Sequence, residues 1–218
     1  MDNFASPLLA QGLAQLGLSL PEGAPEKLLA YASELLKWNE KVSLTAITRT
    51  DEVVDKHLLD SLAALPEVSG ARHLLDLGAG GGMPGIPLAI ALPGLQATLV
   101  DAVAKKVAFM KSGAVKGGVA GRLKAVHARA EGKPEKEGLP RVDLVISRAF
   151  MDVEPFLLLA RHYVLPGGRV VTMTGQTPPE ADLRKWAAAA GLELVSRRLL
   201  ELPLSKDPRG VSVFRAPG

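Results

Sequence analysis

The spacing of apolar residues divides the chain into a helical N-terminal part and a longer part in which short apolar runs alternate with helical segments. Up to residue 64, apolar side chains recur at the spacing of one helix face, first over Ala24–Trp38 and again over Val53–Leu62. Asp51 precedes the second of these segments and is predicted to cap it. Because residues 39–45 between them are polar and irregular, we expect a loop there.

Beyond residue 66, the pattern predicts a sheet whose strands alternate with helices. Helices are expected near 84–92, 103–117, 152–164 and 179–190, and the segment 132–140 is expected to be a mobile loop. This alternation is typical of βαβ units around a parallel sheet. The predicted strands are His73–Leu77, Ala97–Asp101, Leu123–His127, Val142–Ser147, Arg169–Thr174, Leu192–Leu199 and Val211–Arg215.

The last two predicted strands follow one another without a helix, so they are expected to pair as an antiparallel hairpin. The predicted fold is therefore α/β and Rossmann-like, with a mostly parallel seven-stranded sheet, an antiparallel terminal hairpin and an N-terminal helical extension. We divide the chain into a helical cover over residues 1–66 and a sheet domain over residues 67–218. A terminal hairpin indicates a methyltransferase more than a dehydrogenase, whose sheet normally continues with parallel crossovers.

The first predicted strand ends in a glycine loop that has the pattern of a nucleotide-type cofactor site. Glycines permit a positive φ and leave backbone N–H groups open to a ligand, and Pro84 suits the first turn of the following helix. The match to the dinucleotide pattern, Gly80-x-Gly82-x-x-Gly85, is weak evidence by itself. The candidate cofactor contacts in this loop are Gly78, Gly80, Gly82, Met83 and Gly85.

Two aspartates favour S-adenosylmethionine as the cofactor. Asp76 lies just before the first glycine, where a carboxylate repels a pyrophosphate but attracts a cation. We assign it to the amino group of the cofactor, because a carboxylate beside the sulfonium would stabilise a charge that falls in the transition state. Asp101 ends the next strand, 19 residues beyond Gly82, and is placed to accept both hydroxyls of a ribose. The alternatives are a helix or turn cap for Asp76 and a surface acid for Asp101.

Composition excludes several classes of protein. With no cysteine, the chain has no disulfide, thiolate metal site or cysteine nucleophile, and its four scattered histidines show no ligand spacing, so no metal is expected. No apolar run approaches the roughly 20 residues of a membrane span. Met1–Phe4 lacks the basic start of a secretion signal, so we expect a cytoplasmic protein with no membrane partner.

Basic residues are concentrated between residues 100 and 150. This segment holds eleven Lys and Arg against five Asp and Glu, although the net charge of the whole chain is only +3. A basic segment beside a cofactor loop favours a polyanionic substrate such as a nucleic acid. The alternative is a face that serves only solubility.

Two motifs are specific when they occur together: the glycine loop continued through Pro84 and Pro87, and the sequence Ser-Arg-Ala-Phe over Ser147–Phe150. Further motifs of the set are Trp38-Asn39, Leu44-Thr45, Lys56–Ser61, Lys105–Val107, Arg129–Glu131 and Gly175-Gln176. From Trp38 to Arg215 the chain resembles the RsmG family, also called glucose-inhibited division protein B. The resemblance implies a class I (Rossmann-like) S-adenosylmethionine methyltransferase that modifies N7 of a guanine in the 530 loop of 16S ribosomal RNA. The expected partner is this RNA or the small ribosomal subunit, and the chain is expected to act as a monomer.

The resemblance also implies roles for residues outside the glycine loop. Arg148 is the candidate catalytic residue and is expected to contact the methionine end of the cofactor or the target base. The alternative for Arg148 is an ion pair with Asp143 or Asp152. Ala130 and Glu131 follow the third strand and are expected beside the adenine of the cofactor. The candidate substrate-binding residues are Asn39, Lys105, Arg129 and Arg209.

Four positions depart from the usual residues of the family. They are Ser43 (usually Asn), Thr174 (usually Lys), Gly210 (usually His) and Met83 (usually Phe or Leu). The changes at 174 and 210 remove a cation and a polar ring from the side expected to face RNA. Two alternative functions therefore stay open: a methyltransferase acting on a small molecule or protein, and a non-catalytic nucleotide-binding or RNA-binding module.

Overall fold

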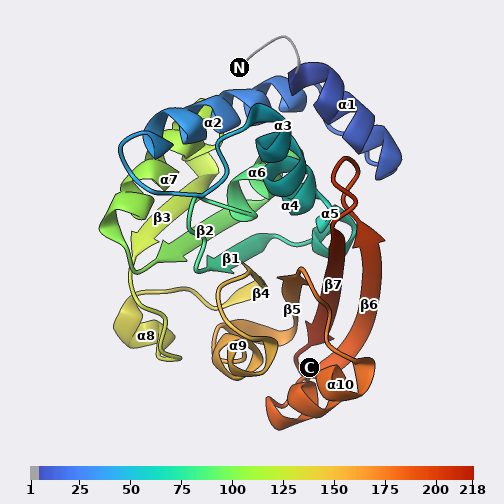
Figure 1. The fold of residues 1–218 in the computed structure, drawn as a ribbon. Coiled ribbons are helices and arrows are strands. Elements are labelled where there is room, and N and C mark those ends of the chain that lie inside the picture. The colour runs from blue at the N-terminus through green and yellow to red at the C-terminus, as the bar shows by residue number, and fades with distance from the viewer. Residues whose placement is uncertain (1–4) are drawn as a thin grey trace.

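The computed structural model describes residues 5–218. Met1–Phe4, the residues used above to predict that the chain has no secretion signal, lie outside the described residues. The chain forms a seven-stranded sheet with the order β3-β2-β1-β4-β5-β7-β6 (Figure 1). β1 to β5 pair in parallel, whereas β7 runs antiparallel to both β5 and β6. This topology confirms the predicted Rossmann-like fold. The strands are β1 His73–Leu77, β2 Gln96–Asp101, β3 Leu123–His127, β4 Val142–Arg148, β5 Val164–Thr174, β6 Glu193–Glu201 and β7 Pro208–Arg215.

Helices cover both faces of the sheet (Figure 1). The N-terminal helices lie on one face together with α6 and α7, and α9 and α10 lie on the other. No helix within residues 5–218 combines the length and the apolar character that crossing a membrane requires. The helices are α1 Ala5–Gln15, α2 Ala24–Asn39, α3 Thr50–Val53, the π-helix η1 Val54–Leu59, α4 Asp60–Leu62, α5 Leu65–Val68, α6 Gly85–Ala91, α7 Ala104–Lys116, the 3-10 helix η2 Ala120–Arg122, α8 Pro134–Glu137, α9 Val153–Ala160 and α10 Glu180–Ala189.

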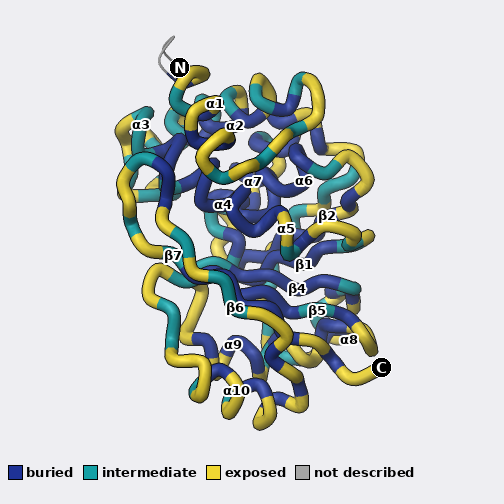
Figure 2. Tube along the Cα trace, turned by 90° about the vertical axis from the view of Figure 1, so that its right-hand side faces the viewer, coloured by how far each residue is buried: buried dark blue, intermediate teal, exposed yellow. Residues whose placement is uncertain are grey.

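The sheet separates two apolar cores, because successive side chains of a strand point to opposite faces. In β1, Leu74 belongs to the core beneath the N-terminal helices and Leu75 to the core beneath α9 and α10. Figure 2 shows the central strands as a buried layer between helices whose outer surfaces are exposed. The same alternation directs Asp76 of β1 and Arg148 of β4 to the face that carries α6 and the N-terminal helices. Asp76 accepts a hydrogen bond from Gly85 of α6, and Arg148 donates to Lys56 and Asp60.

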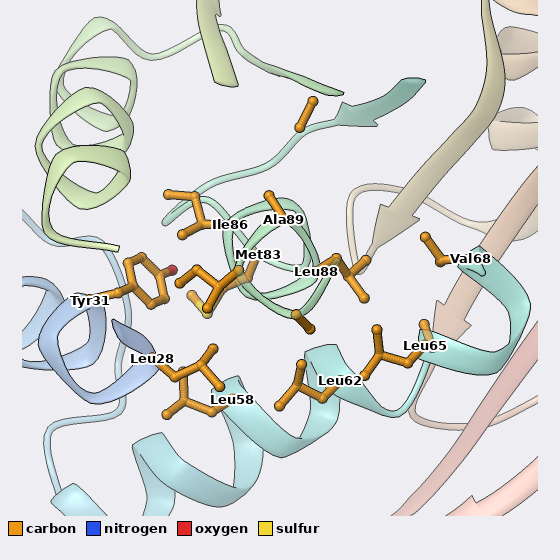
Figure 3. Close-up of a cluster of buried hydrophobic side chains, with 14 of the residues drawn as sticks. Leu28, Tyr31, Leu58, Leu62, Leu65, Val68, Met83, Ile86, Leu88 and Ala89 are labelled. Atoms are coloured by element: carbon orange, nitrogen blue, oxygen red, sulfur yellow. The ribbon is translucent and has the colours of Figure 1, made fainter. Parts of the chain in front are cut away.

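The N-terminal helices share the first of these cores with the sheet domain. Leu28 and Tyr31 of α2 and Leu58 of η1 lie against Met83 of the glycine loop and Ile86 of α6 (Figure 3). The N-terminal segment therefore packs directly against the end of β1 that carries the loop. The boundary between the two predicted domains stays a prediction.

The second N-terminal helix differs from its prediction in two ways. It begins at Thr50, so Asp51 lies inside its first turn and does not cap it. The carboxylate of Asp51 instead accepts hydrogen bonds, at 3.1 and 2.8 Å, from the side chain of Arg49, the residue before the helix. The helix runs without a break to Leu62 but widens to π geometry over Val54–Leu59.

Two connections also differ in detail from their predictions. α6 begins at Gly85, so Pro84 is the residue before the helix and does not occupy its first turn. The segment 132–140, predicted as a loop, contains the short helix α8. Side-chain contacts described below anchor that segment.

Candidate functional site

Two adjoining cavities open at the carboxyl ends of β1, β2 and β4. The first, here called the arginine cavity, has a volume of about 500 Å³ and is lined by the glycine loop together with Arg148 and Arg209. The second, here called the aspartate cavity, has a volume of about 620 Å³ and includes Asp101 in its wall. Gly78, Lys106 and Ala149 line both cavities, so an elongated ligand can contact both at once. Parallel α/β sheets typically bind their ligands at this edge.

The glycine loop adopts a conformation that requires glycine at its first position. Gly78 has a φ of +72°, and a Cβ atom there would lie 2.1 Å from the Cδ2 atom of Phe150. Two contacts hold the loop from below. The backbone N–H of Gly80 donates to Asp101 at 3.0 Å, and the buried hydroxyl of Tyr31 donates to the carbonyl of Gly81. Figure 3 shows Tyr31 beside Met83 at this loop. The loop is therefore held rigidly between the N-terminal helices and β2.

Asp76 lies beneath the loop and has no exposed surface. Its Oδ2 atom accepts a hydrogen bond of 2.8 Å from the backbone N–H of Gly85, the first residue of α6. Its Oδ1 atom is buried without a hydrogen-bond partner among the described residues. Burial raises the pKa of Asp76 to about 7, although the hydrogen bond from Gly85 and the nearby Arg148 both act to lower it. One oxygen thus meets the helix start, as the cap alternative suggested. The other is buried without a partner among the described residues, and Asp76 itself lines neither cavity.

Asp101 is buried at the end of β2 rather than exposed, so the surface-acid alternative was wrong. Its two oxygens accept backbone N–H groups from Gly80 at 3.0 Å and from Val103 at 2.9 Å. A carboxylate oxygen can accept more than one hydrogen bond, so both oxygens retain capacity for hydroxyl groups of a ligand. Lys106 lies 3.9 Å from Oδ2 of Asp101 and adds a cation to the same wall.

The far wall of the aspartate cavity includes Arg129, Ala130 and Glu131. Glu137 of α8 anchors the chain just beyond these residues. Its Oε1 atom accepts the backbone N–H of Glu131 at 2.9 Å and that of Lys133 at 3.0 Å. The hydroxyl of Tyr163 donates to its other oxygen. The sequence did not indicate this role of Glu137, because nothing local to α8 shows which loop its carboxylate meets.

Arg148 lines the arginine cavity and pairs with Asp60, a carboxylate for which no role was predicted. Its Nη1 atom donates to Asp60 and to the carbonyl of Lys56, both at 2.9 Å. Its Nη2 atom lies 3.4 Å from the sulfur of Met83. The alternative pairing with Asp143 or Asp152 was therefore wrong. Arg148 faces the N-terminal helices, whereas Asp143 binds the backbone N–H groups at the opposite end of β1.

The structure brings some of the candidate substrate-binding residues to the cavities and leaves others outside. Arg209 lines the arginine cavity and Arg129 the aspartate cavity, while Lys105 lines neither. Lys106, the next residue along α7, lines both. The amide of Asn39 is used by the loop that follows α2: it accepts the N–H groups of Leu44 and Thr45 and donates to the carbonyl of Thr45. Contacts of Asn39 and Lys105 with a substrate stay predictions.

His57 lines the arginine cavity but lies in a closed set of hydrogen bonds. Its Nε2 atom is 2.9 Å from the hydroxyl of Thr45 and its Nδ1 atom 3.0 Å from the carbonyl of Lys56. Burial, with the neighbouring Arg148 as a second cause, lowers the pKa of His57 to about 4. The ring is therefore neutral at pH 7 and holds the 45–47 segment against η1.

Two of the departures from the family pattern lie opposite each other. Thr174 of β5 lines the arginine cavity, and Gly210 of β7 is its register partner. A Cβ atom at Gly210 would lie 1.6 Å from the hydroxyl of Thr177, so no larger residue fits unless that segment moves. The two changes therefore lie side by side in the sheet, next to the arginine cavity.

The donor set of the cleft fits S-adenosylmethionine better than a metal. Within residues 5–218 no group of three or more His, Cys, Asp or Glu could hold a metal ion. Asp101 lines the aspartate cavity and suits the hydroxyls of a ribose, and Asp76 places a carboxylate with one unpartnered oxygen beneath the glycine loop. The glycine loop between these two aspartates leaves room for a ligand to approach the backbone.

Comparison with known proteins agrees with this chemistry. A family model described as rRNA small subunit methyltransferase G matches residues 24–198. Ribosomal RNA small subunit methyltransferase G of Myxococcus xanthus is 54% identical over 206 residues, which cover 94% of each chain. The protein of that name from Anaeromyxobacter sp. strain Fw109-5 is 48% identical and covers 95% of this chain and 96% of its own. An O-methyltransferase from Bacillus cereus, solved in complex with SAH, superimposes with a TM-score of 0.59 over 97% of this chain and 100% of its own at 16% identity, and so shows the fold alone.

Proposed function

Since the chain belongs to the rRNA small subunit methyltransferase G family, we propose that it methylates N7 of one guanine in the 530 loop of 16S ribosomal RNA with S-adenosylmethionine as the methyl donor. One observation carries the proposal: a glycine loop with two aspartates adjoins a cavity lined by four cationic side chains. These are Lys56, Lys106, Arg148 and Arg209. We further propose that the substrate is the small ribosomal subunit and that the protein acts on it as a monomer in the cytoplasm.

The aspartates and the glycine loop are proposed to hold the cofactor across both cavities. S-adenosylmethionine supplies an electrophilic methyl group bound to a sulfonium. Asp101 accepts the ribose hydroxyls, and the segment at Ala130 and Glu131 lies beside the adenine. Asp76 faces the amino group through the oxygen that has no partner within the described residues. Gly78 and Gly80 allow the backbone to approach the cofactor closely, while Gly82 and Gly85 set the turn into α6.

The target atom requires little chemistry from the side chains. Guanine N7 carries a lone pair in the plane of the base, so it attacks a methyl group without first losing a proton. A general base is not needed, which agrees with a cavity whose histidine is a weak base, with a pKa of about 4, and is already hydrogen-bonded. Holding reactants in line can by itself contribute about 7–11 kcal/mol to lowering a barrier. The protein therefore acts mainly by orienting the base.

The cations of the arginine cavity are proposed to bind and orient the RNA. Arg148 and Arg209 offer planar guanidinium groups that suit a phosphate or the O6 atom of guanine. A base must leave the stack to enter such a cavity, and single-stranded loops of RNA allow this at low cost. Few aromatic residues are present, 4% of the chain, so extended stacking along a channel contributes little.

The proposal is tested by measuring the transfer of labelled methyl groups to small ribosomal subunits that lack native methylation. The expected result is incorporation at N7 of a single guanine, mapped on the RNA, and its loss in Asp76→Ala and Arg148→Ala. Cofactor binding without incorporation into subunits or 16S ribosomal RNA would refute the substrate assignment. Efficient methylation of a small acceptor would then identify the protein as a methyltransferase that acts on small molecules.

A further inference from the structure

Asp60 is the one carboxylate among the described residues that line the arginine cavity. It lies at the start of α4 and is almost completely buried, with 4% of its surface exposed. Its Oδ2 atom accepts a hydrogen bond of 2.9 Å from Nη1 of Arg148, and its Oδ1 atom accepts one of 3.1 Å from Nε of Arg209. A single buried carboxylate thus joins the end of β4 to the start of β7 through two arginines.

We propose that Asp60 is a positioning residue that holds the guanidinium planes of Arg148 and Arg209 in the orientation needed to present the target base. The inference rests on the proposed function. Further contacts restrain both arginines: Arg148 donates to the carbonyl of Lys56, and Arg209 donates to the carbonyl of Pro208 at 2.8 Å. An arginine has five N–H donors, so these contacts leave donors of both side chains for the substrate.

The position of Asp60 in a cationic cavity separates a positioning role from an electrostatic one. A carboxylate among cations opposes the binding of a polyanion, because it cancels part of their charge. If only charge mattered, removing it would leave turnover unchanged and would tighten RNA binding. A positioning role predicts instead that turnover falls, because Arg148 and Arg209 lose the carboxylate that holds both of them. Misplacement of a reacting group by about 1 Å can lower a rate by roughly 100-fold.

A second pair of a carboxylate and an arginine, which resembles the pairs of Asp60, lies away from the cavities. Glu67 of α5 accepts two hydrogen bonds from Arg198 of β6, at 2.7 and 2.9 Å. Like Asp60, it is a nearly buried carboxylate that links the N-terminal helices to the terminal hairpin. Neither Glu67 nor Arg198 lines the arginine or aspartate cavity. Glu67→Gln is therefore the control for Asp60→Asn.

The experiment measures kcat and KM for unmethylated small ribosomal subunits with the wild-type protein, Asp60→Asn and Glu67→Gln. For Asp60→Asn we expect kcat to fall at least 10-fold while KM for the subunits stays unchanged or falls. For Glu67→Gln we expect kcat within twofold of the wild type. A wild-type kcat in Asp60→Asn, or an equal loss of kcat in both variants, overturns the inference alone. No incorporation by the wild-type protein overturns the proposed function, and the inference with it.

A double-mutant cycle shows whether Asp60 acts through an arginine. Arg209→Gln and Asp60→Asn are combined, and the loss of kcat is compared with that of each single variant. We expect the double variant to be within threefold of the worse single variant, because the two changes remove the same interaction. Losses that multiply would contradict the inference.

A further variant covers the case in which Asp60→Asn does not fold. Asp60→Glu keeps the charge but moves the carboxylate by about one bond length, roughly 1.5 Å, and so displaces the anchor of both arginines. We expect it to unfold cooperatively like the wild type and to lose kcat at least 10-fold, with KM for the subunits unchanged. A folded Asp60→Glu variant with the kcat of the wild type overturns the inference.

Discussion

Replacing Asp76 by asparagine is expected to increase stability at alkaline pH while weakening the cofactor site. Burial raises the pKa of this carboxyl from its usual value of 3.8 to about 7. Between these values the folded chain keeps a proton that the unfolded chain has released. The unfolded state binds fewer protons there, so the free energy of unfolding contributed by Asp76 falls as the pH rises from about 4 to about 7.

The size of the effect follows from the difference between the two pKa values. Each unit corresponds to about 1.4 kcal/mol, and a difference of about three units gives roughly 4 kcal/mol. Asparagine has the same shape and carries no charge, and its oxygen can still accept the hydrogen bond from Gly85. We therefore expect Asp76→Asn to exceed the wild type in free energy of unfolding by a few kcal/mol at pH 8.5 and by only about 1 kcal/mol at pH 4.5.

Urea unfolding of both proteins at the two pH values tests this prediction, since m-values show whether the same surface is exposed. Asp143→Asn is the matched control. Asp143 also binds backbone N–H groups at β1, of Arg72 and His73, and its loss should destabilise the fold because charged acceptors form the stronger hydrogen bonds. Calorimetry should show weaker binding of S-adenosylhomocysteine to Asp76→Asn. Equal destabilisation of Asp76→Asn at both pH values would refute the reasoning.

Three further predictions concern the loops and the cations of the cleft. Glu137→Ala should weaken binding of S-adenosylhomocysteine at least several-fold, because it frees the segment beside the aspartate cavity. Calorimetry tests this, with a change at the exposed neighbour, Glu135→Ala, as the control. Equal affinities of the two variants would contradict the prediction. Tyr31→Phe should lower the free energy of unfolding by about 1–3 kcal/mol, since the buried carbonyl of Gly81 loses its donor; an unchanged urea midpoint would count against this. Binding to small subunits should weaken steeply with salt, with a slope of about −3 in log K against log salt concentration for four cationic contacts. A flat salt response would exclude phosphate contacts by these side chains.

Much of the fold follows from periodicity that is local in the chain. The strand His73–Leu77 and the helices near 84–92 and 103–117 agree with the structure to within a residue or two, because buried strands and amphipathic helices leave distinct apolar patterns. The antiparallel pairing of the last two strands also followed, since no helix separates them. Helix caps were harder to predict, as Asp51 shows, because a cap depends on which residue leaves helical geometry first.

Within the candidate site, the sequence indicated residues that belong to contiguous motifs. The glycine loop, Asp101 and Arg148 all follow directly from strand ends, where a parallel sheet collects its ligand-binding residues. Lys105 and Lys106 could not be distinguished by sequence, because both lie in the first turn of α7. The rotation of that helix against the sheet directs Lys106 to both cavities and leaves Lys105 outside.

The sequence by itself determined the α/β alternation, the glycine loop with its aspartates, the family resemblance and the type of cofactor, because each of these lies in neighbouring residues. Only the tertiary structure decided what those residues contact. Asp60 meets Arg148 across 88 positions of the chain and Arg209 across 149. The motif Lys56–Ser61 contained Asp60, but no spacing within it shows which cations it faces. Such contacts form only when the N-terminal helices pack on the sheet, and that packing is set by the shared apolar core.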